Sequence, residues 1–124
     1  MIVQGISEGF HNAATALVDD SGILYASEAE RHSKVKNDRF LGKHLRELDA
    51  DVRVFYEDYE LKNERRLAFG QSSLNPKIYN RYSYYRNHHE SHAASAYYTS
   101  PFDNDVVVVV IDAIGEWDTS SIWT

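Results

Sequence analysis

The chain has 124 residues, of which 43% are hydrophobic and 26% are charged, a balance typical of a globular protein and not of a disordered one. Its 13 lysines and arginines against 19 aspartates and glutamates give a formal net charge of -6, which argues against a uniformly basic nucleic-acid-binding protein. No cysteine is present, so a disulfide scaffold, a cysteine zinc finger and a thiol nucleophile are excluded, and any metal must be held by histidine, aspartate or glutamate.

No segment of the sequence has the length or pattern of a membrane or export signal. The longest purely apolar run, residues 106–111, is far shorter than the roughly 20 residues of a membrane-spanning helix. The first residues lack a basic region followed by an apolar stretch, so they do not form a signal peptide. The sequence therefore predicts one small cytoplasmic domain.

Three short strands are expected at the start of the chain. Residues 1–6 begin with Ile and Val, and residues 14–18 and 23–26 are short apolar runs on either side of the turn-forming sequence DDSG. Two apolar runs around such a turn predict a β-hairpin. The highly charged residues 28–38 that follow are expected to form a solvated turn.

The middle of the chain predicts a helix and then a strand. Residues 38–48 place five side chains on one helical face, with Asp38 as the N-cap: Phe40, Leu41, His44, Leu45 and Leu48. Residues 52–56 alternate as a strand does, and residues 59–67 are compatible with a helix. Residues 72–86 contain Tyr79, Tyr82, Tyr84 and Tyr85. They are typical of a loop or an edge strand, although tyrosines can also stack on a nucleic-acid base.

The last third predicts a helix between two strands. Asn87 and Glu90 have the spacing of a capping box, and Pro101 ends the helix that begins there. Residues 106–111, VVVVVI, are typical of a strand covered on both faces in a parallel or mixed sheet, and we expect it in the same sheet as the opening hairpin. Residues 120–124 begin a further strand. The order of elements predicts an α/β fold with a mixed sheet and flanking helices, and its interruption in this strand suggests a fragment, a split gene product or a truncated paralogue.

Three side chains near the end of the chain could bind a metal. His88 and His92 are four residues apart and share one helical face, and Asp112 follows the apolar strand. Two imidazoles and a carboxylate, with open positions, suit Fe(II) or another divalent transition metal. The alternative is that the histidines only pack or cap the helix. His89 lies on another face and is expected to be a hydrogen-bonding neighbour.

A second candidate cluster lies near the opening turns. His11 follows the first strand and could act as an acid or base, although an exposed loop histidine is the simpler interpretation. Arg31, Lys34 and Lys36 could bind a phosphate, or they could belong to a solvated charged turn with the acidic residues beside them. No GxGxxG, GxxxxGK[ST] or GxSxG motif occurs.

Four stretches of the sequence, in order, resemble the O-carbamoyltransferases, a family that acts on nodulation factors and on tobramycin and cephamycin antibiotics. The stretches are GISEGFHNAATALVDDSGILYASEAERHSKVKND, FYEDYELKNERRLAF, NHHESHAASAYYTSPFD and VVVVVIDAIGEWDTSSIW. The resemblance implies the first half of an actin/Hsp70-like, ribonuclease H-like ATPase domain, so residues 1–124 would be its N-terminal lobe. That domain is similar to the tRNA threonylcarbamoyladenosine-forming protein.

The resemblance also implies a reaction and a set of site residues. Carbamoyl phosphate and ATP, with Mg²⁺, give carbamoyl-adenylate, and the carbamoyl group then passes to a hydroxyl of a small-molecule acceptor with help from a metal such as Fe(II). The metal ligands would be His88, His92 and Asp112. His11 would be catalytic, and Lys36, together with Arg31, would bind substrate or phosphate. Lys36 and His11 are expected to line one anion-accepting concavity.

The sequence departs from the family in its length, because family members are several times longer. The second half of the ATPase-like domain and the carbamoyl-adenylate-forming domain are absent from these 124 residues. We therefore expect the isolated chain to be inactive and to depend on a partner chain or on self-association. The alternatives are a non-catalytic metal- or nucleotide-binding module and a relative of the tRNA-modifying protein, against which the block GEWDTSS argues.

Overall fold

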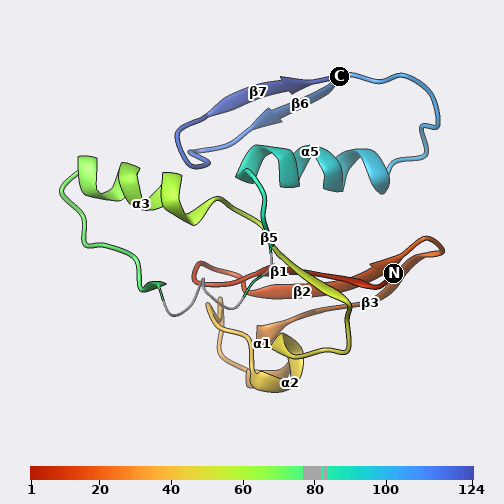
Figure 1. The fold of residues 1–124 in the computed structure, drawn as a ribbon, viewed down its shortest axis with the longest axis horizontal. Coiled ribbons are helices and arrows are strands. Elements are labelled where there is room, and N and C mark those ends of the chain that lie inside the picture. Colours follow the sequence, from red (N-terminus) through yellow and green to blue (C-terminus); the bar gives the residue numbers. More distant parts are fainter. Residues whose placement is uncertain (77–81, 83) are drawn as a thin grey trace. The chain divides into compact units, whose positions relative to one another are not determined.

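The computed structural model describes residues 1–76, 82 and 84–124, which form two compact units (Figure 1). The first unit comprises Met1–Phe55 and the described residues of Pro76–Tyr84. The second unit comprises Tyr56–Asn75 and Tyr85–Thr124. Each unit has its own sheet and helices, and the two are described separately.

The first unit is built on a mixed sheet. Its strands are β1 (Val3–Ser7), β2 (Ala14–Asp19), β3 (Gly22–Glu28) and β4 (Val52–Phe55), and the edge strand β5 (Tyr84–Tyr85) begins in this unit. The strand order is β3-β2-β1-β4-β5. The β1–β2 and β2–β3 pairs are antiparallel, and the β1–β4 pair is parallel. The predicted α/β class, the three opening strands, the hairpin and the strand near residue 52 are thus confirmed.

Two short helices, α1 (Ala29–Ser33) and α2 (Lys43–Arg46), lie on the same side of this sheet in Figure 1. The prediction of a helix from residue 38 with Asp38 as N-cap is wrong, because α2 begins only after Gly42. The Asp38 side chain instead accepts a hydrogen bond from the Phe40 N–H, and its carbonyl accepts one from the Ala13 N–H. The backbone at Asp38 is therefore hydrogen-bonded to the 9–13 loop, at the position where the predicted helix would have to start. The helix α1 was not expected within the charged turn.

The core of the first unit consists of side chains from the sheet and from the segments that cover it. Ile6, Leu45 and Phe55 are buried, and Phe55 stacks on Tyr82 with ring centroids 4.8 Å apart. Tyr82 therefore belongs to the core. Tyr84 lies on the edge strand, as expected of this cluster, whereas Tyr79 lies outside the described residues.

The second unit contains two helices and a two-stranded antiparallel sheet: α3 (Tyr59–Ala68), α5 (His88–Tyr98), β6 (Val108–Ile111) and β7 (Ser120–Trp123). The Asp58 carboxylate caps α3 by accepting hydrogen bonds from two N–H groups. The Asn87 side chain caps α5 by accepting a hydrogen bond from the Glu90 N–H, which is the forward half of the predicted capping box. The helix α5 packs against the β6–β7 hairpin (Figure 1).

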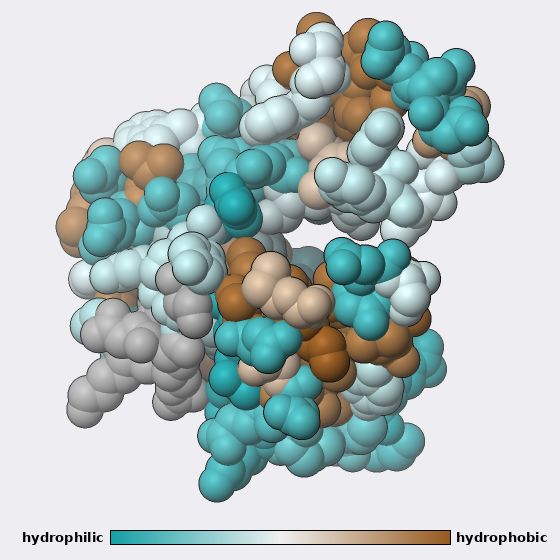
Figure 2. All heavy atoms as spheres, turned by 45° about the vertical axis from the view of Figure 1, so that its right-hand side comes forward, coloured by the Kyte–Doolittle hydropathy of each residue, from teal (hydrophilic) through white to brown (hydrophobic). Residues whose placement is uncertain are grey.

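The prediction that residues 106–111 form a strand buried on both faces is wrong for the described part of the chain. Strand β6 begins at Val108, pairs there with β7 alone and does not share a sheet with the opening hairpin. Val110 is 7% exposed, but Val109 and Ile111 are 58% and 80% exposed. Brown apolar atoms are visible at the surface of this part of the molecule, at the top of Figure 2. A run of β-branched residues fits a strand covered on one face as well as one covered on two, so the pattern cannot distinguish them.

Among the described residues, no helix is long and apolar enough to cross a membrane.

Candidate metal centre

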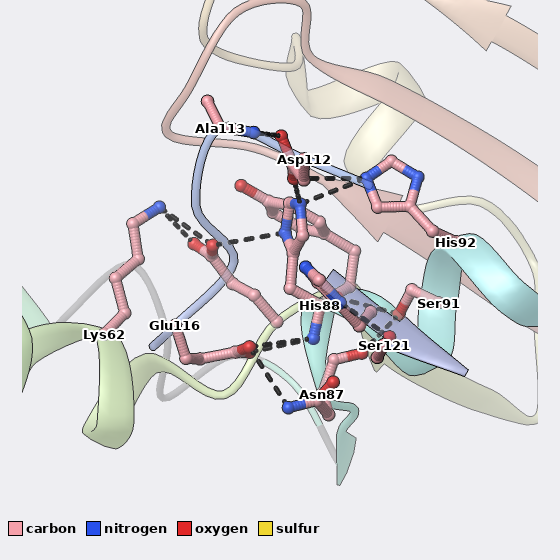
Figure 3. A network of polar contacts seen from close by, with 12 residues as sticks. Lys62, Asn87, His88, Ser91, His92, Asp112, Ala113, Glu116 and Ser121 are labelled. Carbon is pink, nitrogen blue, oxygen red and sulfur yellow. Dashed lines mark hydrogen bonds and ion pairs between the residues drawn. The ribbon is translucent and has the colours of Figure 1, made fainter. Parts of the chain in front are cut away.

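Three polar side chains converge in the second unit (Figure 3). His88 and His92 lie one turn apart on α5, and Asp112 directly follows β6. The distance from His88 Nε2 is 2.7 Å to Asp112 Oδ2 and 3.1 Å to His92 Nε2, and His92 Nε2 is 3.6 Å from the same carboxylate oxygen. Ligand atoms that sit about 2.0–2.2 Å from one ion are about 2.8–3.6 Å apart in octahedral or tetrahedral geometry. The three side chains are therefore placed as ligands of a common ion would be.

The carboxylate of Glu116 fixes the start of the helix that carries both histidines. Glu116 is 3% exposed, and its two oxygens accept the backbone N–H of His88 at 2.9 and 3.1 Å. The same carboxylate accepts hydrogen bonds from Asn87 Nδ2 at 3.2 Å and from the Asp58 N–H at 2.7 Å. Since Glu116 follows β6 by only a few residues, it ties the loop that bears Asp112 to the first turn of α5.

Asp112 is held as a carboxylate by its neighbours. Its Oδ1 accepts the Ala113 N–H at 2.6 Å, and its Oδ2 faces both imidazoles. Partial burial by itself would raise the pKa of Asp112, but the Ala113 N–H, the His88 hydrogen bond and the charges of His88 and His92 together lower this pKa below its ordinary value. A metal ligand must be deprotonated, and this environment favours that form.

Gly115 lets the same loop pack directly on the histidine rings. A Cβ at this position would lie 2.7 Å from His89 Cδ2 and 2.9 Å from His88 Cδ2, closer than carbon atoms approach. A residue with a side chain would therefore not fit at position 115 without moving these rings. His89 itself is fully buried, and its Nδ1 lies 2.7 Å from Ser121 Oγ, so it is a hydrogen-bonding neighbour on another helix face, as expected.

The opposite edge of the His88 ring faces a buried ion pair. Glu57 is 2% exposed, and Lys62 Nζ donates hydrogen bonds to its two oxygens at 2.7 and 2.8 Å. Glu57 Oε2 is 4.0 Å from His88 Nδ1. That nitrogen is buried and has no hydrogen-bond partner among the described residues. The Tyr56 ring packs edge-on against His88, with centroids 5.4 Å apart.

The donor set fits a divalent transition metal such as Fe(II). Two imidazole nitrogens and one carboxylate oxygen are ligands that such ions take in proteins. A carboxylate behind a histidine ligand is also a common partner in metal sites. Binding of a metal by His88, His92 and Asp112 stays a prediction. Neither Glu57 nor Glu116 was among the residues expected from the sequence.

The sequence-predicted substrate residues lie in the first unit and are exposed. His11 stacks on Phe10, with ring centroids 4.3 Å apart, and Arg31 lies on α1. Lys36 lies in the connection after α1. Their roles in catalysis and substrate binding stay predictions.

The structure brings the loops that carry His11 and Lys36 side by side. Glu30 Oε2 accepts hydrogen bonds from Asn12 Nδ2 at 3.3 Å and from the Asn37 N–H at 2.9 Å. The backbone of the 9–13 loop is also hydrogen-bonded to the carbonyls of residues 38 and 39. One carboxylate thus joins the direct sequence neighbours of His11 and Lys36.

Comparison with known proteins places the chain in a family. Residues 45–124 match the family described as "Carbamoyltransferase N-terminus". An uncharacterized protein of Synechocystis sp. is 30% identical, with 98% of this chain and 27% of that protein aligned. An uncharacterized protein of Methanocaldococcus jannaschii is 51% identical over 29% of this chain and 6% of its own length. The chain thus spans about a quarter of the length of the first relative, and all three candidate metal ligands lie within the family match.

Proposed function

The chain belongs to the carbamoyltransferase N-terminal family, and from that premise we propose that it is the N-terminal segment of an enzyme that transfers a carbamoyl group. The carbamoyl group would come from carbamoyl phosphate, pass through carbamoyl-adenylate and reach a hydroxyl of a small-molecule acceptor. The convergence of His88, His92 and Asp112 within the matched residues is the observation that carries the proposal.

We propose further that the two units are parts of an actin/Hsp70-like ATPase domain that uses ATP with Mg²⁺. The chain spans 27% of its Synechocystis relative, so catalysis would require segments beyond these 124 residues. A partner chain or a second copy could supply them. The whole reaction is therefore proposed for the assembled enzyme and not for this chain alone.

In the proposed mechanism His88 and His92 would hold the metal through Nε2, and Asp112 would hold it through Oδ2. The bound metal would supply a Lewis acid that polarises a substrate oxygen. Because a histidine ligand must present a free lone pair, the single proton of the neutral His88 ring would reside on Nδ1. Glu116 holds the first turn of α5 by its backbone, which keeps His88 oriented toward Asp112.

The first-unit residues would act on the phosphate part of the donor. Carbamoyl phosphate is a mixed anhydride whose phosphate group carries about two negative charges near neutral pH, so the Lys36 ammonium and the Arg31 guanidinium suit it as partners. His11 would give a proton to a phosphate oxygen or take one from it. The hydrogen bonds of Glu30 to both loops support this grouping, since they hold the backbone beside His11 and Lys36 together.

Metal titration of the purified chain tests the centre. We expect about one Zn²⁺ or Co²⁺ per chain by isothermal titration calorimetry, and at least a tenfold weaker affinity after His88→Ala or Asp112→Asn. His44→Ala, which changes an exposed histidine of the first unit, is the matched control. Absence of metal binding, or binding that the two variants leave unchanged, would contradict the metal centre.

A transfer assay tests the reaction. The chain is incubated with carbamoyl phosphate, ATP, Mg²⁺, Fe(II) and a panel of hydroxyl compounds, with and without the remaining part of the Synechocystis relative. We expect no turnover by the chain alone and carbamoyl transfer once the missing part is supplied. Robust turnover by a monomer of the isolated chain would refute the proposed dependence on further segments.

The alternative function is a non-catalytic metal- or nucleotide-binding module. The observation in its favour is that all three candidate metal ligands lie within this chain, so metal binding would need no other segment. Metal binding without any restored transfer would favour this alternative. For the tRNA-modifying relative the structure offers no added support, and the net charge of -6 gives no reason to propose a nucleic-acid partner.

A further inference from the structure

We propose that Glu57 is a positioning residue of the metal centre, whose buried carboxylate accepts the Nδ1 proton of His88 and so fixes Nε2 as the ligand atom. The inference rests on the metal site of the proposed function and assigns a role to a residue outside its three ligands. Glu57 would not touch the metal or the substrate, and it would act only through His88.

The orientation of the His88 ring is the first part of the argument. Its Nε2 lies 2.7 Å from Asp112 Oδ2, so this edge of the ring faces the proposed metal position. Its Nδ1 must therefore point the other way, and there Glu57 Oε2 lies 4.0 Å away. In Figure 3, His92 and Lys62, the ion-pair partner of Glu57, lie on opposite sides of His88. The carboxylate thus stands behind the ring and not among the ligands.

The second part of the argument is that His88 Nδ1 is buried and has no hydrogen-bond partner among the described residues. With Nε2 bound to a metal, Nδ1 would carry the proton of the neutral ring, and a buried donor without a partner is destabilising, so a group that can accept its proton is favoured. Closing the gap from 4.0 Å to a hydrogen bond of about 2.7–3.2 Å needs a movement of roughly 1 Å. Metal binding at Nε2, which leaves the proton on Nδ1, provides the reason for that movement.

The Lys62 ammonium explains how a carboxylate can be kept in this place. The side chains of Glu57 and Lys62 are 3% and 14% exposed, so a lone negative charge there would be poorly solvated. Lys62 donates hydrogen bonds to both Glu57 oxygens and offsets the charge. A carboxylate oxygen can accept more than one hydrogen bond, so Oε2 still has a lone pair for His88.

Removing either member of the ion pair separates positioning from simple structural support. Both Glu57→Gln and Lys62→Met break the pair, but only Glu57→Gln removes the carboxylate that faces His88. We expect Glu57→Gln to weaken Zn²⁺ affinity about tenfold and Glu57→Ala about 100-fold, the usual range for partners of histidine ligands. Lys62→Met should change the affinity less than threefold. The matched control is Glu60→Gln, which changes an exposed glutamate of α3, the helix that carries Lys62.

Two further measurements keep the test decisive. The ¹⁵N resonance of His88 Nδ1 in the Zn²⁺-loaded chain should shift more in Glu57→Gln than in Lys62→Met and stay in place in Glu60→Gln, because only Glu57→Gln removes the carboxylate that would accept its proton. Circular dichroism shows whether each variant is folded, and Lys62→Gln, which also breaks the ion pair, replaces Lys62→Met if the latter is not.

The outcomes distinguish this inference from the proposed function. Unchanged Zn²⁺ affinity in Glu57→Gln would overturn the positioning role. Equal losses in Glu57→Gln and Lys62→Met would also overturn it, because the ion pair alone would then explain both. Failure of the wild-type chain to bind Zn²⁺, or binding indifferent to Asp112→Asn, would instead overturn the metal centre itself and the role of Glu57 with it.

Discussion

Among the described residues, each compact unit contains a buried glutamate that pairs with a cation, and the two glutamates are surrounded differently. Glu8 in the first unit is 1% exposed and pairs with Arg46 of α2. Glu57 in the second unit is 2% exposed and pairs with Lys62 of α3. In both pairs the cation offsets the lost hydration of the carboxylate, since a buried carboxylate needs a counter-charge and hydrogen bonds.

The hydrogen bonds around the two carboxylates show the difference. Glu8 accepts from the Arg46 guanidinium, from the Tyr82 hydroxyl at 2.8 Å and from the Leu41 N–H at 3.2 Å. None of the described polar atoms that are buried without a hydrogen-bond partner belongs to this network, which joins loops and sheet of the first unit. Glu57 instead faces a His88 nitrogen that has no partner among the described residues. A saturated network indicates architecture, whereas a buried polar atom left over beside a ligand cluster points to a site.

The largest effect is expected from Glu8→Gln, which breaks the saturated network. Arg46 would lose its counter-charge in a partly buried position, and the free energy of unfolding of the first unit should fall by about 3 kcal/mol. Urea denaturation followed by circular dichroism measures it. Glu47→Gln, in the exposed pair with Lys43, should cost less than about 0.5 kcal/mol. A Glu8 variant no less stable than this control would show that the first network is not architectural.

An intermediate effect is expected from Gly115→Ala, which disturbs the geometry of the second site. The added methyl group would collide with the His88 and His89 rings, so we expect a loss of about 1–3 kcal/mol in stability. Zn²⁺ affinity should fall at least tenfold because His88 must move. Gly5→Ala, where nothing lies within 4 Å of an added Cβ, is the control. Zn²⁺ titration curves of the two variants that coincide would argue against close packing of the loop on His88.

The smallest effect is expected from Asp38→Asn, which changes a half-buried carboxylate outside both buried ion pairs. Hydrogen bonds from the Ser33 hydroxyl and the Phe40 N–H hold the pKa of Asp38 below its ordinary 3.8. Since the folded pKa is lowered, the stabilisation is present above pH 3.8 and is lost as the pH falls through the lowered value. Urea midpoints at pH 7 and pH 3 should therefore differ slightly more for the wild type than for Asp38→Asn. An identical pH dependence would contradict the assignment.

Local patterns in the sequence predicted the elements that depend on local chemistry. The cap at Asn87, the shared face of His88 and His92 and the position of Asp112 after a strand follow from spacing alone, and the structure brings these side chains together. The opening hairpin follows equally from its turn. These features need only neighbours within a few residues.

Features that depend on distant partners could not be predicted. Glu57 faces the His88 ring from 31 residues away in sequence, and Glu116 accepts the His88 N–H from 28 residues away. No local motif marks either glutamate. The false helix start at Asp38 has the same cause, because its carbonyl is used by the distant Ala13 N–H. The exposure of Val109 depends on which segments cover the hairpin, and composition does not contain that information.

The placement of the two tryptophans has a practical consequence for spectroscopy. Trp117 and Trp123 are the only tryptophans of the chain, and both belong to the second unit. Trp123 Nε1 donates a hydrogen bond to Ser121 Oγ at 2.8 Å, and the same oxygen lies 2.7 Å from His89, the neighbour of His88. Indole emission is therefore a label-free reporter of the unit that carries the histidines. The first unit has no indole, so its unfolding must be followed through tyrosine or backbone signals.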